Sequence, residues 1–224
     1  MPAHYLLRCL GEPGLFTLGG RPVKLRTRKQ LALLCYLAME PRPHTRDALA
    51  DLLWPQAPQG EARHSLTVAM SGLRGKLGKE ALEATADRIR LRPGVVEIDV
   101  DRLLRGEVLG GEFQEPLDVD GFLQAFEVPE ALPFSHWRDA EHARLLPNVR
   151  DALVILIDSC RRTGDFRHIE TLALRLLRFE SLSEEGIRAR MEARAFAGDR
   201  LTALRLFKDW KAALETQLGA SPSP

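Results

Sequence analysis

The sequence of 224 residues has few cysteines and no long apolar segment. Its three cysteines, Cys9, Cys35 and Cys160, are widely spaced and odd in number. This pattern excludes a disulfide scaffold and a CxxC metal site, and it favours a reducing cytoplasm. No apolar run approaches the roughly 20 residues of a membrane span. The N-terminus lacks the basic start and apolar core of a signal peptide. We therefore expect a cytoplasmic protein that makes no contact with a membrane.

Motifs that support catalysis or cofactor binding are also missing. The sequence has no P-loop, no GxGxxG after a strand and no GxSxG. His136, Asp139 and His142 form a histidine cluster, but their spacing does not place both imidazoles on one helix face, as an i, i+4 pair would. The sequence thus predicts no enzymatic activity, no cofactor and no metal.

Charge is distributed unevenly along the chain, although the formal net charge is only +1. Residues 1–92 carry 15 Lys and Arg against 8 Asp and Glu, residues 93–145 carry 4 against 12, and residues 146–224 carry 13 against 11. A basic part followed by an acidic stretch indicates two modules with different partners. The basic module is suited to nucleic acid.

Periodicity, caps and turn residues predict the elements of the basic part. The expected elements are strands at 5–9, 15–18 and 21–25, helices at 27–39, after the N-cap Thr45 and at 61–77, and strands at 81–85 and 88–92. A strand, three helices and a β-hairpin, in this order, are typical of a winged helix. Such a domain inserts its third helix into the major groove of DNA.

The helix expected at 61–77 has two distinct sides. At 100° per residue its apolar residues fall on one arc, and the adjacent arc carries arginines, small hydroxyls and a histidine but no acid. Arginine can read guanine with two hydrogen bonds, and the other side chains can reach bases or phosphates. With arginines of the hairpin and of a helix start added for phosphate contact, the candidate DNA-binding residues are Arg63, His64, Thr67, Ser71, Arg74, Arg88, Arg90 and Arg46.

The second half of the chain reads as a helical module. Residues 99–133 are acidic and rich in turn residues, which predicts an irregular connector, and residues 134–219 are expected to be helical. Gly164-Asp165 and Gly198-Asp199 lie 34 residues apart, the tetratricopeptide period. The predicted fold is therefore mostly α with a small β component: a winged helix at 1–98, followed by a tetratricopeptide-like helical-hairpin domain at 99–224.

Several short motifs resemble a known family. Leu53-Trp54-Pro55, Ala62-Arg63 with Leu66, and Leu73-Arg74 with Lys76-Leu77-Gly78 are similar to the DNA-binding domain of the Streptomyces antibiotic regulatory protein (SARP) family. The second half resembles the bacterial transcriptional activator domain that follows in those proteins, through the motifs Trp137 to Leu145, Leu182 to Glu185, Ala197-Gly198-Asp199 and Leu218 to Pro222.

This resemblance implies a bacterial transcriptional activator with a winged helix of the response-regulator type. It implies binding to direct repeats in double-stranded DNA upstream of a promoter and contact with RNA polymerase. The loop that would face the polymerase carries Trp54, Gln56 and Gln59. A homodimer on adjacent repeats is an arrangement that the sequence leaves open.

A second reading comes from a different functional class. The family's wing usually carries Gly-Tyr before its last strand, whereas Ala86 to Ile89 stand here. In this alternative the protein is an interaction adaptor, in which the winged helix does not read DNA and the helical domain binds a partner. The acid-free arc of the third helix favours the DNA-binding reading over this one.

Overall fold

The computed structural model describes residues 4–109 and 117–219. The chain divides into two compact units: residues 1–105 with 120–145 form the first, and residues 106–119 with 146–224 form the second. The two units interleave along the chain, so no single residue separates them. The domain boundary expected at residue 98 remains a prediction. No helix in the described part is long and apolar enough to cross a membrane.

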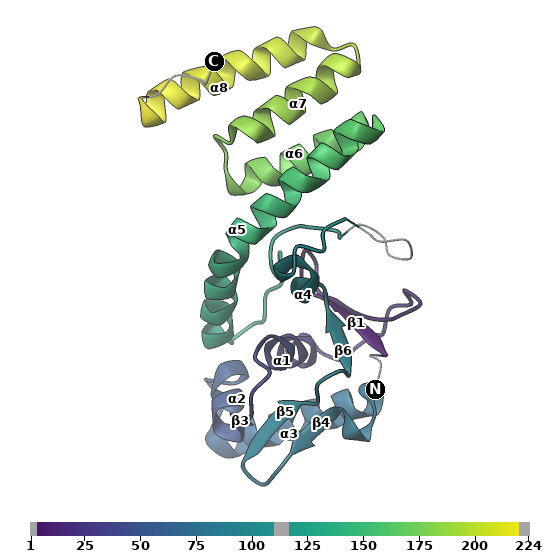
Figure 1. Cartoon of the computed structure of the whole chain (residues 1–224). Helices are drawn as coiled ribbons and strands as arrows, with labels where there is room; N and C mark the ends of the chain where they lie inside the picture. Colours follow the sequence, from purple (N-terminus) through teal and green to yellow (C-terminus); the bar gives the residue numbers. More distant parts are fainter. Residues whose placement is uncertain (1–3, 110–116, 220–224) are drawn as a thin grey trace. The chain divides into compact units, whose positions relative to one another are not determined.

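A three-stranded sheet opens the first unit, in the order β2-β1-β6 (Figure 1). Its strands are β1 (Tyr5–Arg8), β2 (Gly14–Thr17) and β6 (Val96–Ile98). β1 pairs antiparallel with β2 and parallel with β6. The strand expected at 21–25 is wrong: within these described residues only a single bridge joins Phe16 to Pro22. The pairing does not continue because the Arg21 amide donates to the Thr17 hydroxyl, and the Thr17 carbonyl accepts from the Gly20 amide instead.

Three helices follow, and side-chain caps start the first two of them. They are α1 (Arg28–Met39), α2 (Arg46–Leu53) and α3 (Gln59–Leu77). Thr27 caps α1 by accepting from the Gln30 amide, and Thr45 caps α2 by accepting from the Ala48 amide. These contacts satisfy amides that a helix start otherwise leaves without partners. Thr45 therefore acts as the sequence predicted.

The wing is a second three-stranded sheet, in the order β3-β5-β4. Its strands are β3 (His44–Thr45), β4 (Leu82–Ala84) and β5 (Arg88–Leu91), and the short helix η1 (Lys79–Ala81) joins α3 to β4. The strands β4 and β5 form the expected antiparallel hairpin. Ile89 of this hairpin is fully buried, so one face of the wing belongs to the core.

The predicted connector is more ordered than its composition indicated. It begins with α4 (Asp99–Leu104). The Asp99 carboxylate is buried and accepts hydrogen bonds from the amides of Cys9, Leu10 and Val100 at 2.8–3.0 Å. Burial raises the pKa of Asp99 to about 6, against the lowering effect of these amides. This carboxylate therefore ties the end of the first strand to the start of α4.

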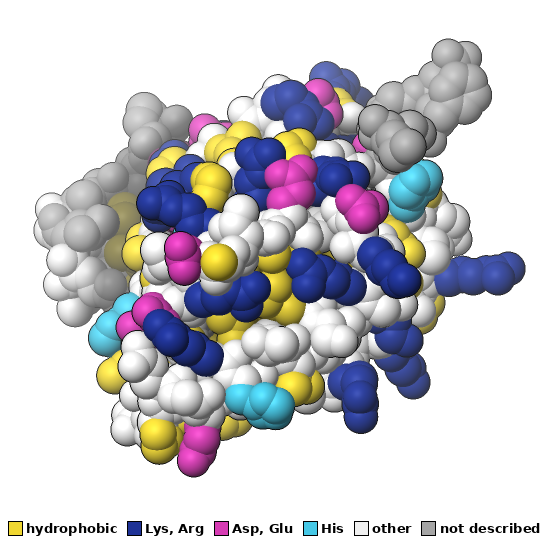
Figure 2. Space-filling view, turned by 90° about the horizontal axis from the view of Figure 1, so that it is seen from below, with side chains coloured by type: hydrophobic (Ala, Val, Ile, Leu, Met, Phe, Trp, Pro, Cys, Tyr) yellow, Lys and Arg dark blue, Asp and Glu magenta, His cyan; other side chains and the backbone are white. Residues whose placement is uncertain are grey.

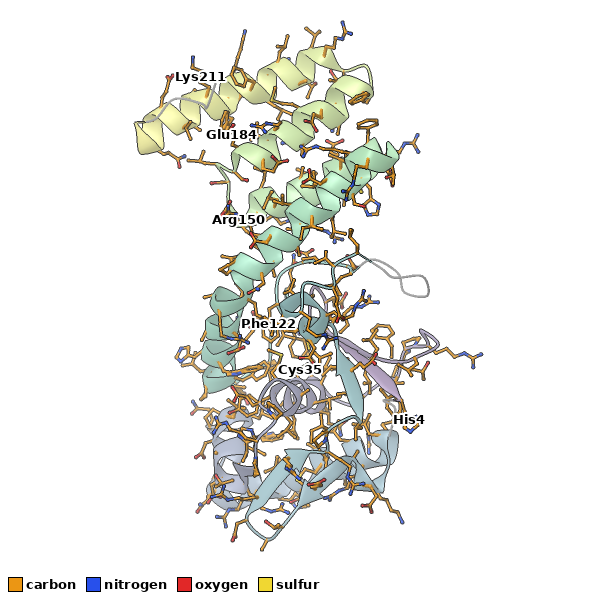
Figure 3. All side chains as sticks on the ribbon, in the orientation of Figure 1. His4, Cys35, Phe122, Arg150, Glu184 and Lys211 are labelled. Atoms are coloured by element: carbon orange, nitrogen blue, oxygen red, sulfur yellow. The ribbon has the colours of Figure 1, made fainter. Side chains whose placement is uncertain are left out.

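An aromatic cluster joins the start of α5 (Leu132–Thr163) to the winged helix within the first unit. The Trp137 ring lies 4.9 Å from the ring of Tyr36 and 5.3 Å from that of Phe134, measured between centroids. Phe134 is fully buried, and Phe122, labelled with Cys35 in Figure 3, packs edge-on against Trp137. The first unit thus extends beyond the predicted winged helix.

The second unit is a set of antiparallel helical hairpins. Besides the later part of α5, it contains α6 (Phe166–Phe179), α7 (Glu184–Phe196) and α8 (Arg200–Leu218). α5 continues through Pro147. Gly164 and Gly198 adopt φ angles of +75° and +84° at the two Gly-Asp turns, a conformation that glycine tolerates without strain. The predicted fold class is confirmed: a winged helix with small sheets precedes a helical-hairpin domain.

Candidate nucleic-acid interface

Helix α3 has the two sides that its sequence predicted. The buried side consists of Ala62, Leu66, Ala69, Met70 and Leu73. On the other side Arg63, His64, Thr67 and Ser71 are exposed. The helix is thus anchored by its apolar arc, and the polar arc faces solvent where a nucleic acid has access.

Arg63 is held by an acid that does not belong to α3. Its Nε and Nη2 donate to the Oδ1 and Oδ2 atoms of Asp47 at 2.6 and 2.7 Å, so the pair is bidentate across α2 and α3. The Arg63 guanidinium lowers the pKa of the Asp47 carboxyl. Guanidinium carries five N–H groups, and this contact uses one edge of it. The edge formed by Nη1 and the second Nη2 hydrogen remains directed away from Asp47.

The small polar residues of α3 lie between the two arginines. The Thr67 hydroxyl donates to the Arg63 carbonyl at 2.9 Å, so its proton is engaged within the helix while its oxygen still can accept. Val68 is 52% exposed on the neighbouring part of the surface, a position that the sequence reading did not single out. An exposed valine among polar residues is able to contact a thymine methyl group.

Arg74 and Arg46 connect the helices to the wing. Arg74 is half-buried, and its Nη2 donates to the Leu82 carbonyl at the start of β4 at 3.1 Å. Arg46 donates from Nε to the Ala86 carbonyl at 2.9 Å and from Nη2 to the Thr85 carbonyl at 3.4 Å. Both guanidinium groups therefore fix the position of the hairpin relative to α2 and α3.

The arginines of the wing differ from one another. Arg90 lies opposite Glu83 in the ladder and donates to its carboxylate at 2.6 Å. Arg92 donates to the same Glu83 at 3.2 Å and to Glu80 at 3.1 Å. Arg88 is exposed near the wing tip, and among the described residues no hydrogen bond or ion pair engages its guanidinium. Of the three, Arg88 is the one best placed to meet a phosphate.

The loop between α2 and α3 presents a mixed surface. Trp54 is half-buried, and the Lys29 ammonium lies 5.3 Å from its ring centroid, a cation–π distance. Gln56 and Gln59 are exposed. This loop stands at the start of α3, so a protein that contacts it approaches the same end of the helix as Arg63.

Positive side chains gather over this end of the molecule. Figure 2 views it from below, and Lys and Arg side chains are spread over the visible face with fewer Asp and Glu among them. Lys76 and Lys79, near the end of α3, are exposed and add to this charge. An extended surface of this kind attracts a polyanion through its phosphates.

Comparisons with known proteins address the second half of the chain directly. Residues 123–224 match the family model described as the bacterial transcriptional activator domain. A search of the curated proteins found no match.

The fold as a whole is similar to that of EmbR from Mycobacterium tuberculosis, solved in complex with a low affinity phosphopeptide. The TM-score is 0.61 at 21% sequence identity, and the match covers 99% of this chain and 62% of that chain. This chain therefore spans less than two thirds of the EmbR chain. The likeness shows the fold: an N-terminal winged-helix region followed by a helical domain.

Asp47, like Val68, is a residue of the candidate interface that sequence reasoning missed. The arc of α3 contains no acid of its own, but α2 supplies one that is 16 residues from Arg63 in the sequence. Asp47 lies in the first turn of α2, where a negative charge meets the helix dipole. No periodicity within α3 reveals a partner from the preceding helix.

Proposed function

We propose that this regulator binds specific sequences in double-stranded DNA through α3 and activates transcription from a nearby promoter. The observation that carries the proposal is the bidentate Asp47–Arg63 pair, which orients a guanidinium on the exposed arc and leaves one of its edges available. That edge can donate two hydrogen bonds to the O6 and N7 atoms of guanine. A fixed orientation lowers the entropy lost when the contact forms.

The remaining groups divide between bases and backbone. Thr67 and Ser71 are short, so α3 can approach the base edges closely, and His64 lies at the same exposed surface. Arg88 at the wing tip suits a phosphate contact. Arg46, Arg74 and Arg90 are engaged within the protein. We assign Arg46 and Arg74 the role of holding the wing and α3 in one arrangement, so that both reach the DNA together.

The activator domain suggests how DNA binding leads to transcription. We propose that the regulator binds direct repeats upstream of a promoter in the cytoplasm, and that the surface of Trp54, Gln56 and Gln59 contacts RNA polymerase. A homodimer on adjacent repeats would raise the local concentration of the second copy without any new DNA contact. The proposed mechanism is the recruitment of RNA polymerase to the promoter, and it includes no catalytic step and no cofactor.

One observation favours the adaptor alternative. Glu83 and Glu80 neutralise Arg90 and Arg92 of the wing, and Asp47 neutralises part of the charge of Arg63. If these pairs persist in every state, the wing offers little positive charge to DNA. The winged helix would then serve as a scaffold while the helical hairpins bind a protein.

A titration of DNA binding at several salt concentrations separates the two functions. With DNA from upstream of the protein's own gene, we expect saturable binding, and log K should fall with log salt at a slope of about −0.9 per neutralised phosphate. Random DNA of the same length is the control, and it should bind more weakly. A flat salt dependence, or no binding at low salt, refutes the DNA-binding function and favours the adaptor.

A further inference from the structure

The turn between α5 and α6 brings three potential metal ligands together in the second unit. The Cys160 thiol, the Asp165 carboxylate and the His168 imidazole each offer a ligand atom, and these atoms all lie within 4.8 Å of one another. Cys160 is half-buried, whereas the other two residues are exposed. The sequence predicted no metal because the spacing of His136 and His142 does not place both imidazoles on one helix face.

Backbone hydrogen bonds fix the relative positions of these three residues. The Asp165 amide donates to the Cys160 carbonyl at 3.0 Å, which closes the end of α5 around Gly164. The His168 amide then donates to the Asp165 Oδ1 atom at 3.2 Å, which starts α6. The second carboxylate oxygen lies 3.5 Å from the His168 Nδ1 atom. The cluster is therefore a product of the turn geometry, with only side-chain torsions left to adjust.

The chain contains the same turn a second time, without the ligands. At Gly198 the Asp199 amide donates to the Arg194 carbonyl at 2.9 Å, and the Thr202 amide donates to the Asp199 side chain at 3.1 Å. These bonds repeat those of the first turn 34 residues later. Arg194 and Thr202 occupy the positions of the cysteine and the histidine. The turn thus requires glycine and aspartate, and it forms equally well without a thiol and an imidazole.

The donor set matches the preferences of one class of cation. We propose that Cys160, Asp165 and His168 bind a zinc ion at the α5–α6 turn, with a water molecule or an external ligand in the fourth position. Thiolate, imidazole and carboxylate are the ligands of Zn²⁺ in proteins, whereas Mg²⁺ and Ca²⁺ take oxygen ligands. Ligand atoms about 2.0–2.3 Å from a tetrahedral zinc lie roughly 3.5 Å apart. The observed cluster needs to close by about an ångström, which rotation of exposed side chains supplies.

The ion would connect the last turn of α5 to the first turn of α6. This junction is also held by the backbone bonds of the turn, by the bond from the His168 amide to the Asp165 carboxylate and by the packing of the two helices. A metal bound to the folded form alone raises the stability of that form by mass action. The binding of zinc should therefore raise the melting temperature of the chain.

Cobalt titration of the full-length, tag-free chain tests the proposal, because a Co²⁺–thiolate bond gives a near-ultraviolet charge-transfer band. We expect a band that saturates at one equivalent and disappears when Zn²⁺ is added, and a melting temperature that Zn²⁺ raises. Cys160→Ser should abolish the band. His136→Asn, which changes an exposed histidine outside the cluster, should leave it unchanged.

A matched pair of variants separates a metal ligand from a helix cap. Asparagine caps helices as well as aspartate does, so Asp165→Asn and Asp199→Asn both preserve their turns. Asp165→Asn should weaken Co²⁺ binding by about tenfold or more, and Asp199→Asn should have no effect. Absence of saturable binding, a band that survives in Cys160→Ser, or equal effects of the two asparagine variants would overturn the proposal.

Discussion

Replacement of Asp47 by alanine tests whether this residue orients Arg63 for base reading. In the folded protein Asp47 engages the Nε and Nη2 atoms of Arg63, and both side chains are about half exposed, at 46% and 52%. Without Asp47 the guanidinium regains its rotational freedom, and DNA binding must then remove that freedom. Immobilising one such side chain weakens binding by about two- to tenfold. Cognate DNA should therefore bind Asp47→Ala more weakly by this factor.

The same substitution should act in the opposite direction on random DNA. Asp47 carries a negative charge beside the proposed interface, and its removal lessens repulsion of phosphates. Non-specific affinity should hence stay constant or rise, and the ratio of cognate to random affinity should fall. The assay is fluorescence anisotropy with a cognate and a scrambled duplex at two salt concentrations.

Two variants complete this experiment. Asp51→Ala removes an exposed charge from the same helix without touching Arg63, so it should leave the ratio of affinities unchanged. Arg63→Ala should weaken cognate binding by roughly 5- to 150-fold and relax the preference at one base pair. If Asp47→Ala raises cognate and random affinity by equal factors, Asp47 only sequesters Arg63, and the proposed reading geometry is wrong.

Three further predictions concern the stability of the first unit. Burial raises the pKa of Asp99 to about 6, so between pH 4 and pH 6 the folded chain retains a proton that the unfolded chain loses. Relative to Asp99→Asn, the free energy of unfolding in urea should therefore fall by about 2 kcal/mol from pH 4 to pH 7, and a constant difference would contradict this. In α3, Gly72→Ala should lower the free energy of unfolding by about 1–3 kcal/mol, because a Cβ there collides with buried Gln30. In the same helix a Cβ at Gly75 meets no atom within 4 Å, so Gly75→Ala should raise the free energy of unfolding by up to about 1 kcal/mol. A fragment of residues 1–145 should unfold cooperatively on heating, as followed by circular dichroism. A fragment of residues 1–131 should show a much less cooperative transition, since it lacks the fully buried Phe134. Equal transitions would show that the aromatic cluster does not stabilise the winged helix.

Local signals in the sequence were sufficient to predict most helices. The N-cap Thr45 marked the start of α2, and the apolar arc of α3 identified its buried side. These features depend on hydrogen bonds and contacts within a few residues, which a one-dimensional pattern records. The strand expected at 21–25 failed although glycine and alternating residues suggested a hairpin. The Arg21 amide donates to the Thr17 side chain instead of the carbonyl opposite, so the pairing stops at the bridge between Phe16 and Pro22.

Features that depend on tertiary contacts could not be predicted from the periodicity and caps of the sequence. Asp47 meets Arg63 from another helix, and Asp99 meets the Cys9 amide across 90 residues. The ligand cluster around Asp165 was missed because its members flank a chain reversal, so no single helical or strand period relates them. In each case the side chain is ordinary in its own segment and acquires its role from the segment packed against it.

The arginines of the candidate interface show why the count of basic residues overstates the charge available to DNA. Arg46 and Arg74 donate to backbone carbonyls of the wing, so their charges lie at the interface while their N–H groups hold the fold. Arg90 is paired with Glu83. Among these arginines of the described chain, Arg63 and Arg88 are exposed, and Asp47 engages one edge of the Arg63 guanidinium. In the proposed function, Arg63 contacts a base and Arg88 a phosphate, while Arg46 and Arg74 fix the wing relative to α3. We therefore expect this arrangement to discriminate between DNA sequences, because the wing does not move to accommodate a wrong base pair.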